Sequence, residues 1–344
     1  MKENKFHKKT ILIIGPYSSI GGVSAHIKRL ANLLVYKYKI VFIDESPLSE
    51  SSKYIYNLRN KNLVEYFRRV SKSNIIHIHT GVWWLRLVHV IIGKILRKKI
   101  IVTVHSLTNL KSKIPFFLTK QVFYLNNQTI FVNSLIKEKF NFLKNTHVIP
   151  AFLPPVEKEI NIPSDLLSII QDTDYKIIVA NAYRIIIDNG IDLYGIDIAI
   201  RTAKLFKANK KKYKIIFVIA SLLENNGLYE KYKQQIINEG IEKEIFLYPK
   251  AINFVSLIRL SDLVIRPTNS DGDALTIREA LFLNTPIIAS DVITRPEGTV
   301  IFKNRNANDL FKKIDYVLSS KIEVRNTSYE IDYRQIYFEI YNSN

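Results

Sequence analysis

The chain of 344 residues contains no cysteine, which excludes disulfide bonds and every metal site that depends on a thiolate ligand. It also lacks an apolar run long enough to cross a membrane, because basic residues interrupt the main candidate, Val88–Ile101. The apolar segment Ile11–Ile14 behind the basic N-terminus is too short for the core of a signal peptide. The sequence therefore predicts a cytosolic protein that is soluble or bound to a membrane surface.

Acidic residues are scarce, with 31 Asp and Glu against 50 Lys and Arg and a formal net charge of +19. Such an excess indicates an anionic partner, although drift toward a lysine-rich composition stays open as an alternative. A membrane and nucleic acid are the macromolecular candidates, and no recognition motif supports nucleic acid. Three stretches that mix aromatic and basic residues favour the membrane: Tyr54–Lys72, Trp83–Lys99 and Leu110–Lys120.

No repeat is present, and the length suits two domains of ordinary size. Apolar strand patterns alternate with helical spacing, which predicts α/β units with parallel sheets. The proline-rich segment Ile149–Pro155 separates two doubly wound halves. Strands are expected at residues 10–14, 39–43, 75–78, 99–104, 129–132, 147–149, 175–180, 214–219, 244–247, 263–266 and 286–289. Helices are expected at residues 23–36, 82–96, 135–142, 197–208, 227–239, 251–258, 274–283 and 307–318.

The most informative segment, Ser261–Asp291, combines a short strand, an acidic glycine loop, a helix and a second strand. The open N-terminus of a helix in this setting is a seat for phosphate, because its amides and its dipole face the anion. Asp271 in the loop and Glu279 on the helix bind phosphate poorly, so we expect them to bind hydroxyl groups. A ligand with phosphates in the middle and hydroxyls at both ends is a nucleotide sugar.

This segment resembles the E-x7-E segment of the retaining glycosyltransferases of family 4, which are group 1 enzymes of polysaccharide biosynthesis. Glu279–Leu281 matches the second half of the motif, and Asp271 replaces its first glutamate. The resemblance implies the α/β fold called GT-B, in which two Rossmann-like, doubly wound domains face each other across a cleft. It further implies an acceptor and membrane-facing domain at residues 1–152, a nucleotide-sugar domain at 153–325, and a helix at 326–344 that crosses back to the first domain.

The resemblance also implies roles for individual residues. Arg184 neutralises the donor diphosphate, Glu279 holds the ribose hydroxyls, and Asp271 holds hydroxyls of the sugar. His105 lies close to the transferred sugar, so catalysis is expected to depend on His105, Asp271 and Arg184. The residues expected at the acceptor side or the cleft are His79 and Tyr194, and those expected to bind the donor are Gly21, Gly22, Arg184, Asp271, Gly272, Asp273, Ala274, Leu275, Thr276 and Glu279.

The chain departs from the family at the lysine that usually accompanies the arginine of the diphosphate site. Two segments fit the Gly-apolar-Asp step that follows this lysine, Gly190–Asp192 and Gly195–Asp197, and the second leads better into its helix. The residues in the lysine position are Asn189 and Tyr194, so neither supplies a cation. A tyrosine still donates one neutral hydrogen bond, and Arg278 or another nearby base is a candidate to compensate.

Two patterns permit a metal ion instead. His77 and His79 share one face of their strand and suit zinc, but no third ligand stands out in the sequence. Asp271–Asp273 matches the D-x-D metal motif of another glycosyltransferase fold, yet it leads into Glu279, which favours the metal-free GT-B interpretation. The glycine loop Gly15–Val23 lacks the spacing of nicotinamide and flavin enzymes. We therefore expect no metal and no cofactor, with the nucleotide sugar as a substrate.

With these features, the resemblance implies a hexosyltransferase that moves a sugar from a UDP- or GDP-linked donor with retention of anomeric configuration. The expected acceptor is a saccharide or a polyprenyl-diphosphate-linked saccharide of surface polysaccharide biosynthesis, such as that of capsule or lipopolysaccharide. The expected location is the cytoplasm, peripheral to the inner face of the cell membrane. The main alternative is a non-catalytic GT-B protein that binds a nucleotide sugar or a saccharide, which the missing lysine suggests. A GT-B epimerase or phosphorylase also stays open.

Overall fold

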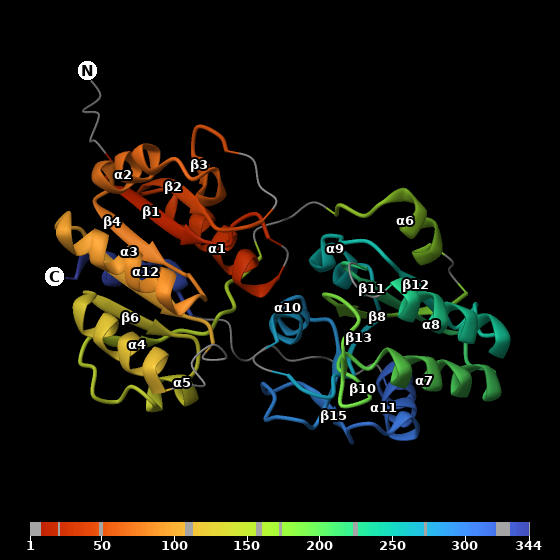
Figure 1. Cartoon of the computed structure of the whole chain (residues 1–344). Coiled ribbons are helices and arrows are strands. Elements are labelled where there is room, and N and C mark those ends of the chain that lie inside the picture. The colour runs from red at the N-terminus through yellow and green to blue at the C-terminus, as the bar shows by residue number, and fades with distance from the viewer. Residues whose placement is uncertain are drawn as a thin grey trace, which may run out of the picture. The chain divides into compact units, whose positions relative to one another are not determined.

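The computed structural model describes residues 8–19, 21–47, 51–106, 113–155, 160–171, 174–222, 226–271, 274–320 and 331–343. The chain divides into two compact units, one formed by Met1–Leu153 with Ile331–Asn344 and the other by Pro154–Glu330. Each unit is built on one parallel sheet with helices on both faces (Figure 1). The predicted α/β class with parallel sheets is therefore confirmed.

The first unit contains a seven-stranded sheet in the order β3-β2-β1-β4-β5-β6-β7. Its strands read as continuous apolar runs because helices cover both faces of the sheet. The interior strand β1 is buried from Ile11 to Gly15. The strands are β1 Thr10–Gly15, β2 Lys39–Asp44, β3 Ile55–Asn57, β4 Ile75–Ile78, β5 Lys99–Val104, β6 Gln128–Phe131 and β7 Thr146–Val148.

Helices α2, α3 and α4 pack on one face of this sheet and share one apolar core with it. Helices α1 and α12 pack on the other face, where Leu30 and Tyr337 belong to a second core. Helix α12 therefore completes the first unit although it follows the second unit in the chain (Figure 1). The helices are α1 Gly22–Leu34, α2 Leu63–Lys72, α3 Trp83–Ile95, α4 Lys113–Leu125, α5 Ser134–Glu138 and α12 Tyr333–Asn342, with a 3₁₀ turn at Leu58–Asn60.

The second unit contains a six-stranded sheet in the order β12-β11-β8-β13-β14-β15. Helices α7, α8 and α11 cover one face, and α6, α9 and α10 cover the other. An antiparallel hairpin, β9 Ile187–Asp188 and β10 Ile191–Asp192, lies between β8 and α7 in the sequence. The remaining elements are α6 Ser164–Ile170, β8 Lys176–Ala182, α7 Ile196–Ala208, β11 Tyr213–Ile219, α8 Asn226–Glu239, β12 Ile245–Tyr248, α9 Phe254–Arg259, β13 Leu263–Arg266, α10 Leu275–Phe282, β14 Ile287–Ser290, β15 Val300–Phe302 and α11 Ala307–Ser319.

Every strand expected from the sequence is present, with ends that differ by at most two residues, but several elements were not expected: β3, β15, the β9–β10 hairpin, α2, α4 and α6. The helix expected at residues 135–142 is wrong in length, because α5 ends at Glu138. The helix expected at residues 251–258 starts later than predicted, because Asn253 caps α9 by accepting a hydrogen bond from the Ser256 amide.

Within the described part of the chain, no helix has the length and apolar character that a bilayer span requires.

Candidate active site

The carboxyl ends of three neighbouring strands, β8, β13 and β14, bring charged residues of the second unit to one edge of its sheet. Arg184 follows β8, Arg266 is the last residue of β13, and Asp271 lies between β13 and α10. Open parallel sheets bind ligands at this edge, because loops and helix N-termini meet there. The start of α10 is therefore the candidate site of the second unit.

The side chain of Asp271, 7% exposed, lies between cations. Its Oδ2 atom accepts hydrogen bonds from Arg295 Nη1 at 2.8 Å, Arg266 Nε at 3.1 Å and Thr268 Oγ1 at 3.2 Å, and its Oδ1 atom accepts one from Arg266 Nη2 at 3.1 Å. Burial raises the pKa of Asp271, but the charge of Arg266 and the bonds from both guanidinium groups outweigh burial, so the pKa lies below its ordinary value. The carboxylate is ionised at neutral pH, and a sugar hydroxyl would have to share it with these side chains.

Tyr194, one of the two residues that align with the expected lysine, is fixed by the hairpin before α7. Asp192 Oδ1 accepts hydrogen bonds from the amides of Tyr194 and Gly195, each at 2.9 Å, and Asp192 Oδ2 accepts one from the Tyr232 hydroxyl at 2.7 Å. Gly195 has a φ of 76°, and a Cβ atom there would lie 2.0 Å from the carbonyl oxygen of Pro267, so this position requires glycine. Helix α7 begins directly after Gly195, so of the two candidate segments Gly195–Asp197 is the one that leads into a helix.

The guanidinium group of Arg266 lies over the Tyr194 ring, 5.7 Å from its centroid. Burial raises the pKa of Tyr194 above its ordinary value, while the charges of Arg266 and Arg184 oppose this shift and the charge of Asp271 adds to it. Arg266, Arg184 and Asp271 therefore all lie within electrostatic range of Tyr194. The structure brings together three residues that the sequence singled out and adds Arg266, which it did not.

Helix α10 begins beside these cations with Ala274 at its N-cap, a residue whose methyl group cannot accept a hydrogen bond from the first-turn amides. Thr276 in the first turn donates its hydroxyl to Asn181 Oδ1 at 3.1 Å. Glu279 lies further along α10 and is largely buried, with 7% of its surface exposed. Two residues expected to bind the donor, Gly272 and Asp273, lie outside the described residues.

The first unit gathers histidines at the carboxyl ends of β4 and β5. His77 is fully buried and uses both ring nitrogens, Nδ1 with the Tyr341 hydroxyl at 2.5 Å and Nε2 with the Thr103 hydroxyl at 2.8 Å. His79 Nδ1 and His105 Nε2 share one hydrogen bond at 3.1 Å. The structure thus joins His79 and His105 and leaves His77 with structural partners.

His26 of α1, which the sequence did not single out, completes this cluster. Its Nδ1 donates to the carbonyl of Ala151 at 2.7 Å, and its ring centroid lies 5.3 Å from that of His79 and 5.0 Å from that of His105. Burial lowers the pKa of His26 to about 4 and lowers the pKa values of His79 and His105 well below the ordinary value, so all three are neutral at pH 7.

One nitrogen from each of these three rings lies within 4.8 Å of the others, and neutral imidazoles in such a group are a donor set that Zn²⁺ accepts. The sequence analysis considered the pair His77 and His79, whereas this group combines His79 with two histidines of other segments and leaves out His77. The sequence analysis missed His26 because its neighbours in the cluster belong to other elements.

The glycine pair lies at the start of α1. Gly22 is the first helical residue, and Gly21 at the N-cap has a φ of 140°, which favours glycine.

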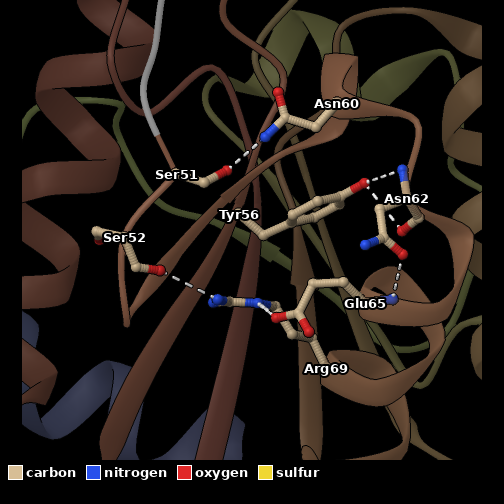
Figure 2. Close-up of a pocket in the computed structure, with 7 residues that line it drawn as sticks. All are labelled: Ser51, Ser52, Tyr56, Asn60, Asn62, Glu65 and Arg69. Atoms are coloured by element: carbon tan, nitrogen blue, oxygen red, sulfur yellow. Dashed lines mark hydrogen bonds and ion pairs between the residues drawn. The ribbon is translucent and has the colours of Figure 1, made fainter.

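The first unit also contains a polar pocket of about 440 Å³, whose lining includes no residue of the histidine cluster (Figure 2). The Tyr56 hydroxyl accepts a hydrogen bond from the Asn62 amide at 2.8 Å, and Arg69 Nε pairs with Glu65 at 2.7 Å. The side chains around the pocket thus bond to one another, and none was predicted as a site residue. The lining consists of Ser51, Ser52, Tyr56, Asn60, Asn62, Glu65 and Arg69.

Residues 185–333 match the family model of the group 1 glycosyl transferases. The match begins directly after Arg184 and includes Asp271, Glu279 and most of the second unit. It supports a glycosyltransferase and agrees with the resemblance seen in the acidic loop and the helix that follows it. No curated protein matches the sequence at a significant level.

Solved glycosyltransferases share the fold of this chain at low sequence identity. HepE of Anabaena in complex with UDP is similar over 92% of this chain and 91% of its own, with a TM-score of 0.67 and 13% identity. A glycosyltransferase of Rickettsia africae is similar over 91% and 89%, with a TM-score of 0.61 and 16% identity. Sucrose-phosphate synthase of Thermosynechococcus elongatus is similar over 91% and 90%, with a TM-score of 0.58 and 14% identity. The predicted GT-B fold is confirmed.

Proposed function

We propose that the chain is a retaining glycosyltransferase of the family 4 type, which moves a sugar from a nucleotide-sugar donor to a saccharide acceptor. The observation that carries this proposal is the meeting of Arg184, Arg266 and the start of α10 at one sheet edge. Cations and open helix amides suit a diphosphate, whose negative charge grows as the glycosidic bond breaks. Solved HepE structures contain UDP and UDP-glucose, which favours a uridine donor over a guanosine donor.

Each remaining site residue has a role in this proposal. Glu279 binds the ribose hydroxyls, and Asp271, held by its two arginines, orients a hydroxyl of the sugar. Arg184 and the amides at residues 274–276 stabilise the departing diphosphate. Because these groups supply positive charge without a metal ion, we propose that transfer is metal-independent. In the first unit, His105 and the Gly21–Gly22 pair serve the sugar and the acceptor.

Nucleotide binding tests this function directly. The full-length protein is expected to bind UDP by isothermal titration calorimetry, and Glu279→Ala is expected to weaken binding roughly 10- to 100-fold, because a buried carboxylate that accepts two hydroxyls contributes about 1.5–3 kcal/mol. Treatment with EDTA is expected to leave the affinity unchanged. Loss of binding on chelation would contradict the metal-free proposal and direct attention to His26, His79 and His105.

A non-catalytic nucleotide-sugar or saccharide-binding protein is the second candidate, favoured by the neutral Tyr194 and by an Asp271 carboxylate already bonded within the chain. Slow hydrolysis of UDP-glucose or a related donor separates the two candidates. Hydrolysis that is lost in Glu279→Ala supports the transferase. Tight UDP binding without hydrolysis of any tested UDP- or GDP-sugar supports the binding protein.

We propose further that the acceptor is a lipid-linked saccharide, such as a polyprenyl-diphosphate intermediate of surface polysaccharide, reached from the cytoplasmic membrane face. Helix α3 carries an exposed apolar stripe at helical spacing, formed by Trp84, Val88, Ile91 and Ile95. Leu63, Val64 and Phe67 of α2, on the same side of the sheet, are exposed as well. Exposed Lys94, Arg97 and Lys72 accompany these apolar residues, and such a surface suits an anionic leaflet.

Flotation with vesicles tests this surface. The protein is expected to float with phosphatidylglycerol vesicles at low salt, and Trp84→Ser is expected to weaken binding at least about fivefold because an aromatic anchor is lost. Tyr316→Ser is the matched control, since Tyr316 is an aromatic residue of the second unit with similar exposure, 61% against 53%. Equal losses for the two variants would contradict a docking surface on α3.

A further inference from the structure

Two arginines bind the same carboxylate, but they differ in what else they contact. Arg295 is buried, with 1% of its side chain exposed, and it also donates from Nε to the Ser290 carbonyl at 3.0 Å and from Nη2 to Ser290 Oγ at 3.2 Å. Every nitrogen of its guanidinium group therefore donates inside the protein. Arg266 keeps 12% of its side chain exposed, so it is the member of the pair that reaches the surface of the site.

Three residues contact the guanidinium group of Arg266 and fix its orientation: Asp271, Tyr194 and Asn181. Its Nε and Nη2 form a fork on Asp271, and a bidentate fork fixes the plane of the group. The guanidinium carbon lies over the Tyr194 ring, 5.7 Å from the ring centroid. The third nitrogen, Nη1, lies 3.4 Å from the carbonyl and from the side-chain oxygen of Asn181, which is long for a hydrogen bond. Nη1 therefore has the weakest internal partners and the greatest capacity for a ligand.

Asn181 connects Arg266 to the start of α10. Its Oδ1 atom accepts the 3.1 Å bond from Thr276, in the first turn of α10, and also faces Arg266 Nη1. The cation thus lies beside the positive end of the helix dipole. The Asp271 carboxylate carries one negative charge for the two guanidinium groups that it binds, so this triad has a net positive charge. A ligand at this point is expected to be an anion.

We propose that Arg266 binds the diphosphate of the nucleotide-sugar donor, with Tyr194 as the flat support of its guanidinium group and with Asp271 and Arg295 as positioning residues. The proposal rests on the proposed function and names a cation for the same site. The glycosyltransferases that the sequence resembles usually carry a lysine in the position for which Tyr194 is a candidate. In this chain, the guanidinium group of Arg266 lies over the neutral Tyr194 ring.

The transfer step shows what this charge does. The bond between C1 of the sugar and the β-phosphate oxygen breaks, and the oxygen keeps the electron pair. C1 forms a bond to the acceptor hydroxyl oxygen on the same face, and the hydroxyl proton passes to a phosphate oxygen of the leaving group. Negative charge on the diphosphate grows while the first bond breaks, and Arg266 stabilises that charge.

Calorimetry with UDP and uridine as paired probes tests the proposal. Arg266→Ala is expected to weaken UDP binding about 10- to 100-fold and to leave uridine binding unchanged, because uridine lacks the phosphates. Arg266→Lys is expected to lie between wild type and Arg266→Ala. Tyr194→Lys placed in the Arg266→Ala protein brings an ammonium group to the same region and is expected to restore most of the UDP affinity. The control is Arg201→Ala, which removes an arginine of α7 that is 49% exposed.

The outcomes separate this proposal from the function on which it rests. If the wild-type protein binds neither UDP nor GDP, both fall. If it binds UDP but Arg266→Ala has unchanged affinity, or loses UDP and uridine equally, Arg266 has no role in binding phosphate while the transferase proposal stands. If thermal melting shows that Arg266→Ala is unfolded, Arg266→Lys alone decides: an unchanged ratio of UDP to uridine affinity overturns the proposal, and a lowered ratio supports it.

Discussion

Gly195→Ala is expected to lower the free energy of unfolding of the second unit by about 3–5 kcal/mol, because two costs add. The new Cβ atom would lie 2.0 Å from the carbonyl oxygen of Pro267, and the backbone would hold alanine at a φ of 76°. Relief of the overlap would move the segment before α7 away from the end of β13. Since that segment carries Tyr194 beneath Arg266, UDP affinity is expected to fall together with stability.

Gly190→Ala is the matched control, because Gly190 has nearly the same φ, 77°, and a Cβ atom there would meet nothing within 4 Å. Its expected cost is about 1 kcal/mol, from the backbone conformation alone. Urea unfolding followed by circular dichroism reports both units, whereas tryptophan fluorescence reports the first unit, where Trp83 and Trp84 lie in α3. Similar losses for the two variants would show that the contact with Pro267 is not the cause.

Acid is expected to destabilise the first unit between about pH 6.5 and pH 4. His26 has a pKa of about 4 in the folded protein because it is buried, against about 6.5 in an unfolded chain. Between these values the unfolded state binds the proton and the folded state does not, so lowering the pH favours unfolding. His26 alone accounts for about 3 kcal/mol at pH 4. Burial shifts the pKa values of His77, His79 and His105 in the same direction.

The measurement is urea unfolding followed by tryptophan fluorescence at pH 7.5 and pH 5, in EDTA so that no metal occupies the histidine cluster. His26→Asn keeps a donor for the Ala151 carbonyl but cannot take up a proton, so its stability is expected to depend less on pH. His147→Asn, on the half-buried edge strand β7 outside the cluster, should resemble wild type more closely. An unchanged pH dependence in His26→Asn would contradict this account.

The main elements of the fold could be predicted from the sequence because strands covered on both faces are continuous apolar runs, as in Lys214–Ile219. The missed elements lack such a signal. Helix α2 carries Leu63, Tyr66, Phe67 and Val70 at helical spacing, but this local pattern was interpreted as part of a membrane-binding stretch because basic residues accompany it. Strand β3 has three residues, too few for a pattern to emerge.

Within the candidate site, local features could also be predicted from the sequence, whereas contacts between distant segments could not. The acidic loop and the helix after it are local features, and the sequence alone predicts a phosphate seat there. The pairing of Arg295 with Asp271 spans 24 residues and depends on β13 and β14 being neighbours, an order that local patterns do not specify. His26 meets His79 and His105 for a similar reason, since β1, which leads into α1, pairs with β4, and β4 pairs with β5. Residues that meet through sheet order were therefore missed.

The position of α12 has a consequence for synthesis on the ribosome. The apolar face of the first sheet that includes Ile11 and Ile13 is completed by Tyr337, Ile340 and Tyr341. These residues emerge only after the whole of the second unit has been translated, so the half of the protein that is made first is the half that finishes folding last. During that interval the part of this sheet face that α12 covers stays exposed in the nascent chain, and such an apolar surface suits binding by a ribosome-associated chaperone.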